Sequence, residues 1–279
     1  MVVHAHPDDE AISTGGILAR YAKEGVRTVL VTCTDGSAGD GPEGVKPGEP
    51  GHDPASVAAM RRTELERSCE ALGVKHLELL GFRDSGMMGW AQNDAPDSFW
   101  STPVSEGAAK LVELFEQYRP QVVVTYDENG FYGHPDHIQA HRITVEATES
   151  TGIPEKLYYT AVPKSWFAEL GTRLNELGIE FPLDDVNAED AAVPAEEHPS
   201  GPEEWGTPDE QVTTVVDVGS AVDQKFDSLL AHSSQSDNIF FLRMGREAFS
   251  EIMTREAFVR VVDRTSAPVP EDDLFAGIR

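Results

Sequence analysis

The chain has 279 residues, of which 39% are hydrophobic, so it can bury a sizeable core in one large domain or two small ones and is not disordered as a whole. Aspartate and glutamate number 49 against 22 lysines and arginines, and the net charge of −27 disfavours binding to nucleic acid or to anionic lipid. The sequence has no long apolar run and no secretory signal at its start, so we expect a soluble cytoplasmic protein without membrane contact.

Short apolar runs alternate with helical patterns over the first part of the chain, which is typical of βα units and a mostly parallel sheet flanked by helices. The expected strands are at residues 2–5, 28–33, 76–80, 122–125 and 156–160. Apolar residues recur at helical spacing between the strands, at residues 12–23, 55–72 and 106–118. Later in the chain we expect a strand at 212–218, a helix at 221–232, and a further helix and strand.

Two long loops interrupt this alternation, at residues 35–53 and 83–102. Both follow expected strands, so both would lie over the carboxyl edge of the sheet, where open α/β folds bind ligands. Residues 180–209 are rich in acidic residues and proline, which indicates an exposed loop or linker. We therefore expect a catalytic core at residues 1–165 and a smaller α/β extension at residues 166–279 that packs on the core as one unit.

The most informative segment is His-Ala-His-Pro-Asp-Asp-Glu at residues 4–10, between an expected strand and a helix. A turn that holds an imidazole and several carboxylates is costly to bury without a metal or a pairing network. A second segment, Tyr-Gly-His-Pro-Asp-His at residues 132–137, also lies between a strand and a helix, so a parallel sheet can bring the two together. They could supply His6, Asp9 and His137 to one ion, and two imidazoles with one carboxylate form the ligand set of a hydrolytic zinc site.

The other polar residues of the two segments suggest the remaining parts of a hydrolytic site. Asp8 is next to an expected ligand and could take the proton of the attacking water. His134 could stabilise or protonate the leaving group, and Asp136 could orient His134.

With both segments intact, the sequence resembles the LmbE-like (PIG-L) zinc-dependent N-deacetylases, whose hallmarks are an A-H-P-D-D-E turn and a later H-P-D-H. The likeness extends through residues 84–87 and 122–128. Within the family, the chain is most similar to two actinobacterial mycothiol enzymes, an N-acetylglucosaminyl-inositol deacetylase and an amidase of mycothiol S-conjugates. The resemblance implies a Rossmann-like domain, one zinc ion and hydrolysis of an amide bond.

The resemblance also implies roles for single residues. It makes His6, Asp9 and His137 the zinc ligands and Asp8 the general base. It makes His134 the general acid or the oxyanion stabiliser, and it places Tyr132 near the carbonyl oxygen. It also places Arg61 and Asp84 at the sugar hydroxyls.

The substrate is less closely defined by the resemblance. The amidase branch tends to have a lysine three residues after the glutamate of the turn, where this chain has Ser13, so a deacetylase acting on a small acylated amino sugar is favoured. The loop at residues 34–40 lacks the acidic pattern of the mycothiol deacetylase, which leaves the exact sugar open. Another divalent metal such as Fe²⁺, the mycothiol S-conjugate amidase activity and a homo-oligomer also stay open.

A competing interpretation is a non-catalytic Rossmann-like protein that binds a nucleotide or a structural metal. No G-x-G-x-x-G or Walker-type loop follows the first strand, which argues against a nucleotide. No cysteine accompanies the histidines as a fourth ligand, which argues against a structural metal. The two cysteines, Cys33 and Cys69, fit reduced core thiols.

Several other residues have a structural and a functional interpretation. His4 alternates with His6 along the strand, so we expect a hydrogen-bonded core histidine. For His141 we favour a structural position in a helix, and for His232 the capping of a helix end. Three loop aromatics could stack on a sugar or fix the loop to the core: Trp90, Phe99 and Trp100.

Overall fold

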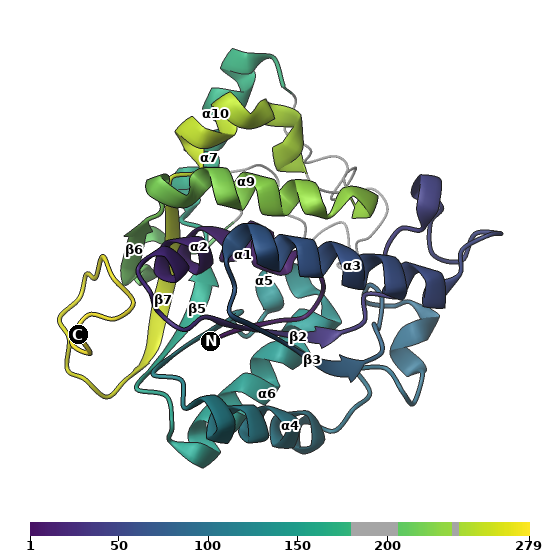
Figure 1. Cartoon of the computed structure of the whole chain (residues 1–279), viewed down its shortest axis with the longest axis horizontal. Coiled ribbons are helices and arrows are strands. Elements are labelled where there is room, and N and C mark those ends of the chain that lie inside the picture. The colour runs from purple at the N-terminus through teal and green to yellow at the C-terminus, as the bar shows by residue number, and fades with distance from the viewer. Residues whose placement is uncertain (180–205, 236–239) are drawn as a thin grey trace.

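The computed structural model describes residues 1–179, 206–235 and 240–279. In this part of the chain, seven strands form one sheet in the order β3-β2-β1-β4-β5-β7-β6 (Figure 1). The strands β1 to β5 are parallel, whereas β7 is antiparallel to both β5 and β6. Their bounds are β1 Val2–His4, β2 Val29–Thr34, β3 His76–Phe82, β4 Val122–Thr125, β5 Lys156–Ala161, β6 Thr214–Asp217 and β7 Arg255–Asp263.

Helices cover both faces of the sheet (Figure 1). On one face lie α4 (Val104–Tyr118) and α6 (Pro135–Thr151), which pack on each other. The other face carries α1 Asp9–Ser13, α2 Gly15–Lys23, α3 Pro54–Leu72 and α9 Val222–Ala231. Within the described residues, the other α-helices are α5 Gly130–Gly133, α7 Lys164–Leu177 and α10 Gly245–Ile252.

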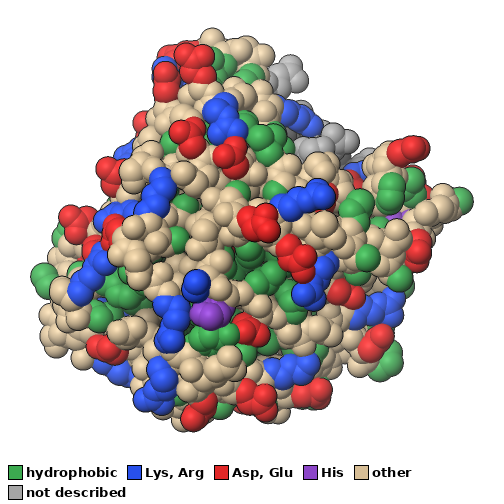
Figure 2. Space-filling model, viewed as in Figure 1, with side chains coloured by type: hydrophobic (Ala, Val, Ile, Leu, Met, Phe, Trp, Pro, Cys, Tyr) green, Lys and Arg blue, Asp and Glu red, His purple; other side chains and the backbone are tan. Residues whose placement is uncertain are grey.

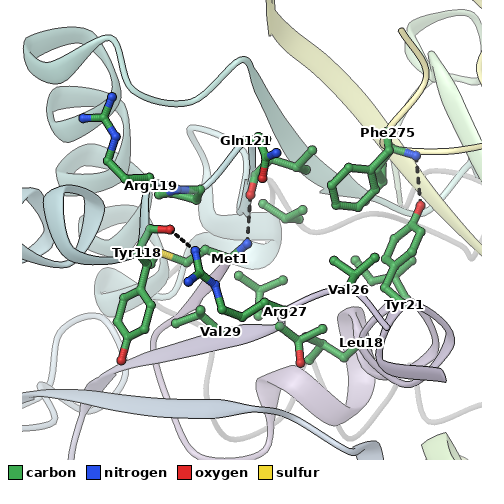
Figure 3. A pocket seen from close by; sticks show the side chains of 17 residues that line it. Met1, Leu18, Tyr21, Val26, Arg27, Val29, Tyr118, Arg119, Gln121 and Phe275 are labelled. Carbon is green, nitrogen blue, oxygen red and sulfur yellow. Dashed lines mark hydrogen bonds between the residues drawn. The ribbon is translucent and has the colours of Figure 1, made fainter. Parts of the chain in front are cut away.

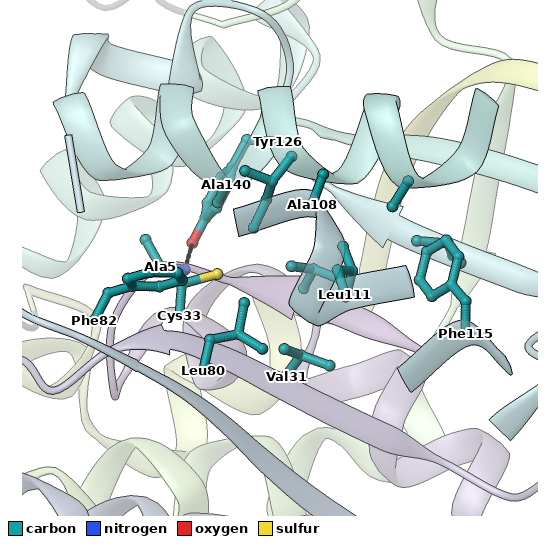
Figure 4. Close-up of a cluster of buried hydrophobic side chains, with 14 of the residues drawn as sticks. Ala5, Val31, Cys33, Leu80, Phe82, Ala108, Leu111, Phe115, Tyr126 and Ala140 are labelled. Carbon is teal, nitrogen blue, oxygen red and sulfur yellow. Dashed lines mark hydrogen bonds between the residues drawn. The ribbon is translucent and has the colours of Figure 1, made fainter. Parts of the chain in front are cut away.

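The central strands are buried on both faces, which explains why they consist of continuous apolar runs. Val3, Val31 and Val123 belong to the core beneath α4 and α6, which Figure 4 shows in close-up. Val2 and Leu30 belong to the core beneath α2 and α3, because successive side chains of a strand point to opposite faces. The predicted α/β fold with a mostly parallel, helix-flanked sheet is confirmed.

The strand order positions the site. From β1 the chain passes outward to β2 and β3 and then returns to β4 on the other side of β1. The carboxyl ends of β1 and β4 therefore lie at the point where the winding reverses, which is where open α/β sheets bind ligands. Residues 5–10 follow β1 and residues 126–137 follow β4, so the two predicted segments meet at this edge.

The predicted strands and helices are present, with one difference. The helix expected at 12–23 is divided at Thr14 into α1 and α2. The amides of Gly16 and Ile17 at the start of α2 donate to the carboxylate of Glu256 on β7, which fixes the position of this helix. The acidic loop expected at 180–209 lies mostly outside the described residues, so its conformation stays a prediction.

The second part of the chain completes the sheet that the first part begins, because β7 pairs with β5 and β6 pairs with β7. The division at residue 165 itself stays a prediction. Acidic and basic side chains are interspersed over the face shown in Figure 2. Among the described residues, no helix is both long enough and apolar enough to cross a membrane.

Candidate metal centre

The turn after β1 brings His6 and Asp9 together. The backbone amide of His6 donates to Asp9 Oδ2 (2.7 Å), and His6 Nδ1 lies 3.4 Å from the same oxygen. The other ring nitrogen, Nε2, is hydrogen-bonded to the carboxylate of Asp136 (3.2 Å). One nitrogen of His6 is thus held by a carboxylate while the other faces Asp9.

His137 is placed in the same way from the opposite side. Its Nδ1 is hydrogen-bonded to the carbonyl of Gly130 (3.2 Å), and its Nε2 lies 3.4 Å from Asp9 Oδ1. Only glycine fits at position 130, where φ is +61° and a Cβ would lie 2.7 Å from the Cβ of His137. The Nε2 of His137 is buried without a hydrogen-bond partner. A ring with its Nδ1 fixed by a carbonyl and its Nε2 facing a carboxylate without a hydrogen bond is typical of a metal-ligating histidine.

Asp9 lies between the imidazoles of His6 and His137, with Oδ2 facing His6 and Oδ1 facing His137. Burial by itself would raise the pKa of Asp9, but His137 and His6 hold it well below its usual value, so the carboxylate is ionised. Burial would likewise lower the pKa of His6, but the carboxylates of Asp84, Asp136 and Asp9 raise it well above normal. This concentration of buried acidic and basic groups fits a divalent cation, and the nitrogen and oxygen donors suit zinc or iron.

A third imidazole, His134, lies beside the first two. Ring nitrogens of His6, His134 and His137 fall within 4.8 Å of one another. Burial, together with His6 and His137, holds the pKa of His134 well below its usual value, so its ring is neutral. A neutral imidazole at this place could serve as a metal ligand or in proton transfer. A further cluster with metal-ligand spacing consists of His6, Asp84 and Asp136.

The expected support of His134 by the Asp136 side chain differs in the structure. His134 is the N-cap of α6, and its Nδ1 accepts from the backbone amide of Asp136 (3.1 Å). The Asp136 carboxylate instead contacts His6 and accepts from the amide of Ser85 (2.9 Å). The start of α6 explains this difference. The N-cap residue His134 binds the backbone amide of Asp136, so the Asp136 carboxylate is free to reach His6 in the turn after β1.

Asp8 is the more exposed of the two adjacent aspartates, with 19% of its side chain accessible. Its φ of +126° is rare outside glycine, and its Oδ2 accepts from Arg61 Nη2 (2.9 Å). Burial raises the pKa of Asp8, and Arg61 opposes this effect. A carboxylate with a raised pKa that lies beside the candidate metal ligands and is partly accessible to solvent has the properties of a general base.

The last residue of the motif, Glu10, fixes the turn from behind. Its Oε2 accepts from the amide of Asp8 (3.0 Å), and its Oε1 is hydrogen-bonded to His232 Nε2 (2.7 Å) and to Ser68. All three side chains are fully buried. His232 does occupy the C-cap position of α9, but its ring contacts a residue 222 positions earlier in the chain. No local sequence pattern indicated this contact.

Arg61 and Asp84, expected at the sugar hydroxyls, lie behind Asp8 and His6. Their side chains are 5% and 4% exposed. Arg61 donates to Asp8 and to the carbonyls of Pro7 (2.6 Å) and Gly36 (2.8 Å), while Asp84 Oδ1 accepts from the amide of Gly86 (2.8 Å). These contacts indicate that both residues support the site from within. Ser13, the other expected substrate residue, is half-buried at the end of α1.

Tyr126 is the site residue that sequence reasoning missed. Its hydroxyl donates to Asp9 Oδ2 (2.7 Å) and accepts from the amide of Ala5 (2.9 Å), and its ring stacks on His137 with the centroids 4.2 Å apart. The available signal was its position directly after β4, at the same edge as His6. Tyr132, by contrast, is 39% exposed beside His137, with the two ring centroids 5.2 Å apart.

The structural interpretation of His4 and Phe99 is confirmed. His4 is fully buried between the hydroxyls of Tyr126 (3.1 Å) and Thr14 (2.8 Å), and burial lowers its pKa to about 4. His141 is hydrogen-bonded to the carbonyl of Tyr126 (3.0 Å). Phe99 is buried and stacks on Phe82, so this loop aromatic fixes the loop to the core.

A cavity of about 350 Å³ lies at the opposite, amino edge of the sheet (Figure 3). Apolar side chains and the aromatic rings of Tyr21, Tyr118 and Phe275 line much of it. Arg27 spans one side and donates to the carbonyl of Tyr118. None of the predicted site residues lines this cavity, so it is separate from the candidate metal centre.

Comparisons with known proteins agree with this geometry. The family model described as PIG-L, GlcNAc-PI de-N-acetylase, matches residues 1–148. The chain is also 41% identical over 291 residues to the 1D-myo-inositol 2-acetamido-2-deoxy-alpha-D-glucopyranoside deacetylase of Acidothermus cellulolyticus. That match covers 100% of this chain and 94% of the relative.

Solved structures with the same fold include enzymes of different reactions. The N,N'-diacetylchitobiose deacetylase of Pyrococcus horikoshii is 20% identical with a TM-score of 0.55, covering 93% of this chain and 82% of that one. The 4-carboxy-2-hydroxymuconate hydratase of Pseudomonas putida is 18% identical with a TM-score of 0.57, and the match covers 96% of this chain and 97% of the hydratase chain. The shared fold alone therefore does not identify the reaction.

Proposed function

Because the chain belongs to the PIG-L family of GlcNAc-PI de-N-acetylases, we propose that it removes the N-acetyl group from 1D-myo-inositol 2-acetamido-2-deoxy-α-D-glucopyranoside by metal-dependent hydrolysis. The observation that carries the proposal is the Asp9 carboxylate, with each of its oxygens 3.4 Å from a ring nitrogen of His6 or His137. The match to a deacetylase of this substrate over the whole chain supports the choice of sugar.

In this proposal His6, Asp9 and His137 hold one divalent metal, with zinc as the first candidate and Fe²⁺ as the second. The bound metal would supply Lewis acidity that polarises the amide carbonyl. Asp136 and the carbonyl of Gly130 fix the outer nitrogens of the two histidines, which sets their tautomers and orientation. Tyr126 fixes Asp9 in the same manner.

Asp8 takes the proton of the attacking water. It is suited to this step because burial raises its pKa. Arg61 holds the Asp8 carboxylate, and the Glu10 carboxylate holds the Asp8 backbone by accepting from its amide, so Asp8 keeps one orientation. His134, a neutral ring whose Nδ1 accepts from the amide of Asp136, stabilises the oxyanion through its Nε2–H. In the alternative role of general acid it would first take up a second proton, and the proton that Asp8 accepted from the water goes to the leaving amine. The Tyr132 side chain is 39% exposed beside His134, with the ring centroids 6.0 Å apart, and we place its hydroxyl near the carbonyl oxygen.

The contacts of Arg61 and Asp84 modify one part of the interpretation. Both residues border the catalytic turn but are engaged with the backbone or with other side chains. We therefore propose that Arg61 orients Asp8 and that Asp84 orients His6. The sugar hydroxyls would contact only the accessible edges of the Arg61 and Asp84 side chains. Ser13, at the end of α1, stays a proposed substrate contact.

Acetate release tests the function directly. The purified protein is incubated with Zn²⁺ or, without oxygen, with Fe²⁺, and with a panel of three substrates: the inositol compound above, N-acetylglucosamine and a mycothiol S-conjugate. We expect equal amounts of acetate and free amine from the inositol compound, with Asp8→Asn as the inactive control. Faster cleavage of the mycothiol conjugate would favour an amidase. No hydrolysis by metal-loaded protein would contradict the proposal and favour a binding protein.

A further inference from the structure

A row of aromatic rings leads outward from the metal centre. Tyr132 is next to His137, and Phe131 lies edge-on to Tyr132 with the ring centroids 6.1 Å apart. Phe131 in turn stacks on Phe167 of α7, with centroids 6.5 Å apart and ring planes 16° from parallel. Phe131 and Tyr132 are both 39% exposed. The row therefore presents two accessible aromatic side chains directly beside the proposed site of reaction.

Phe131 has a backbone conformation that a bulky residue rarely adopts. Its φ is +68° and its ψ is −63°, inside the short segment Gly130–Gly133. The carboxylate of Asp127 stabilises this turn by accepting from the amides of Asn129 (3.0 Å) and Phe131 (2.9 Å). Glycine would adopt the same conformation without steric cost.

Burial does not account for this arrangement. A ring that is 39% exposed gains less from the hydrophobic effect than a core phenylalanine such as Phe115, which is fully buried. Strained residues that persist at the surface cluster at ligand sites, where the side chain is needed in that place. The position of Phe131, one ring beyond Tyr132, indicates which ligand group it would meet.

We propose that Phe131, supported by Phe167, is a stacking platform for the second ring of the substrate, the ring to which the N-acetylated sugar is linked. This inference rests on the proposed function and makes its specificity more definite. With the acetamido sugar beside Tyr132, the linked ring extends over Phe131. The C–H face of a cyclitol or sugar ring is apolar and flat, and an aromatic face is its natural complement.

The charge of the segment narrows the choice of ligand. Asp127 and Glu128 directly precede the turn that carries Phe131, and Glu128 is exposed. Carboxylates at this place disfavour an anionic group through like-charge repulsion. The platform thus suits an uncharged polyhydroxy ring better than a phosphorylated one.

A purely structural role makes a different prediction. If Phe131 served only to attach α7 through Phe167, its removal would lower the thermal stability and would affect all substrates alike. A platform for the second ring, in contrast, matters only for substrates that have that ring. Phe131→Gly separates the two roles because glycine accepts the positive φ and removes the strain.

The experiment compares zinc-loaded wild type with Phe131→Gly on two substrates: the inositol compound, which has two rings, and methyl 2-acetamido-2-deoxy-α-D-glucopyranoside, which has one. We expect KM for the two-ring substrate to rise about 2- to 12-fold, the range of an aromatic stacking contact, with kcat nearly unchanged. The one-ring substrate should keep its kcat/KM. Phe131→Tyr should restore the wild-type KM, and Phe131→Gly should melt at the same or a higher temperature.

Equal losses on both substrates, or an unchanged KM for the two-ring substrate, would overturn the platform. Binding of the two deacetylated amines, measured by calorimetry, gives a second readout that does not require turnover. Phe131→Gly should weaken binding of the two-ring amine only. If wild type hydrolyses neither substrate, the proposed function fails, whereas the ratio of the two binding constants still decides whether Phe131 contacts a second ring.

Discussion

The turn after β1 and the segment after β4 both contribute to the candidate metal centre, with His6 and Asp9 from the first and His137 from the second, but they are built differently. The turn is enclosed by buried partners, since Glu10 and Arg61 hold its backbone and Tyr126 holds Asp9. The segment after β4 has a buried half at His134 and His137 and an exposed half at residues 131–132. In the proposed function, the enclosed turn is fixed in advance for chemistry, whereas the half-exposed segment would both position a ligand and contact the substrate.

The sharpest test of the enclosed turn is Asp9→Ala. Asp9 is the single residue between both imidazoles, so we expect loss of bound metal together with loss of all hydrolysis above background. Metal content by elemental analysis and acetate release are the measurements. Retention of one metal per chain would show that the three histidines, which also have metal-ligand spacing, form the site without Asp9.

Its neighbour in the same turn should behave differently. Asp8 points toward Arg61 and solvent, so Asp8→Asn should keep the metal while kcat falls by about 10² to 10⁴, as for loss of a general base. The control is the metal content of the same sample. A metal-free Asp8→Asn, or one with nearly normal turnover, would show that the roles of the two aspartates are wrongly assigned.

His134→Ala tests the buried half of the segment after β4. We expect kcat to fall by about 10² or more with metal affinity near normal, because His134 is outside the proposed ligand set, in which Asp9 pairs with the other two histidines. Metal titration of the variant decides between proton transfer and ligation. If the metal is lost, His134 is a ligand and the proposed set must change.

His232→Leu tests whether the enclosure of the turn depends on the distant end of α9. It leaves Glu10 buried without its charged partner, which typically lowers the free energy of unfolding by about 3 to 5 kcal/mol. Urea unfolding is the measurement. Glu66→Gln is the matched control, because the Arg62–Glu66 pair is about half exposed and should change stability by about 1 kcal/mol or less. Similar effects of the two variants would refute a special role for the buried pair.

The smallest effect concerns Asp136, which connects the two segments by contacting His6 from α6. Asp136→Asn should lower metal affinity by about 10- to 100-fold through the altered orientation of His6, with the fold unchanged. Competition with a chelator measures this affinity. If turnover falls while metal affinity stays normal, the carboxylate acts on His134 as the sequence suggested.

The sequence by itself determined the fold class and the two segments. Parallel strands covered on both faces must be continuous apolar runs, so the central strands β1, β2 and β4 could be located, and the carboxyl ends of β1 and β4 had to carry residues 4–10 and 132–137. The roles of Asp8, Asp9 and the histidines came from the residue types and from a family resemblance. For this reason the proximity of these residues was predictable, although the hydrogen-bond partner of each one was not.

Tertiary structure alone decided the supporting contacts. Tyr126 reaches Asp9 because β4 pairs with β1, and His232 reaches Glu10 because α9 packs on α3, neither of which follows from local spacing. The Asp136 carboxylate was directed to His6 by the geometry of a helix start. Local sequence constrains backbone conformation and burial, whereas the partner of a buried polar side chain depends on which distant element fills the space beside it.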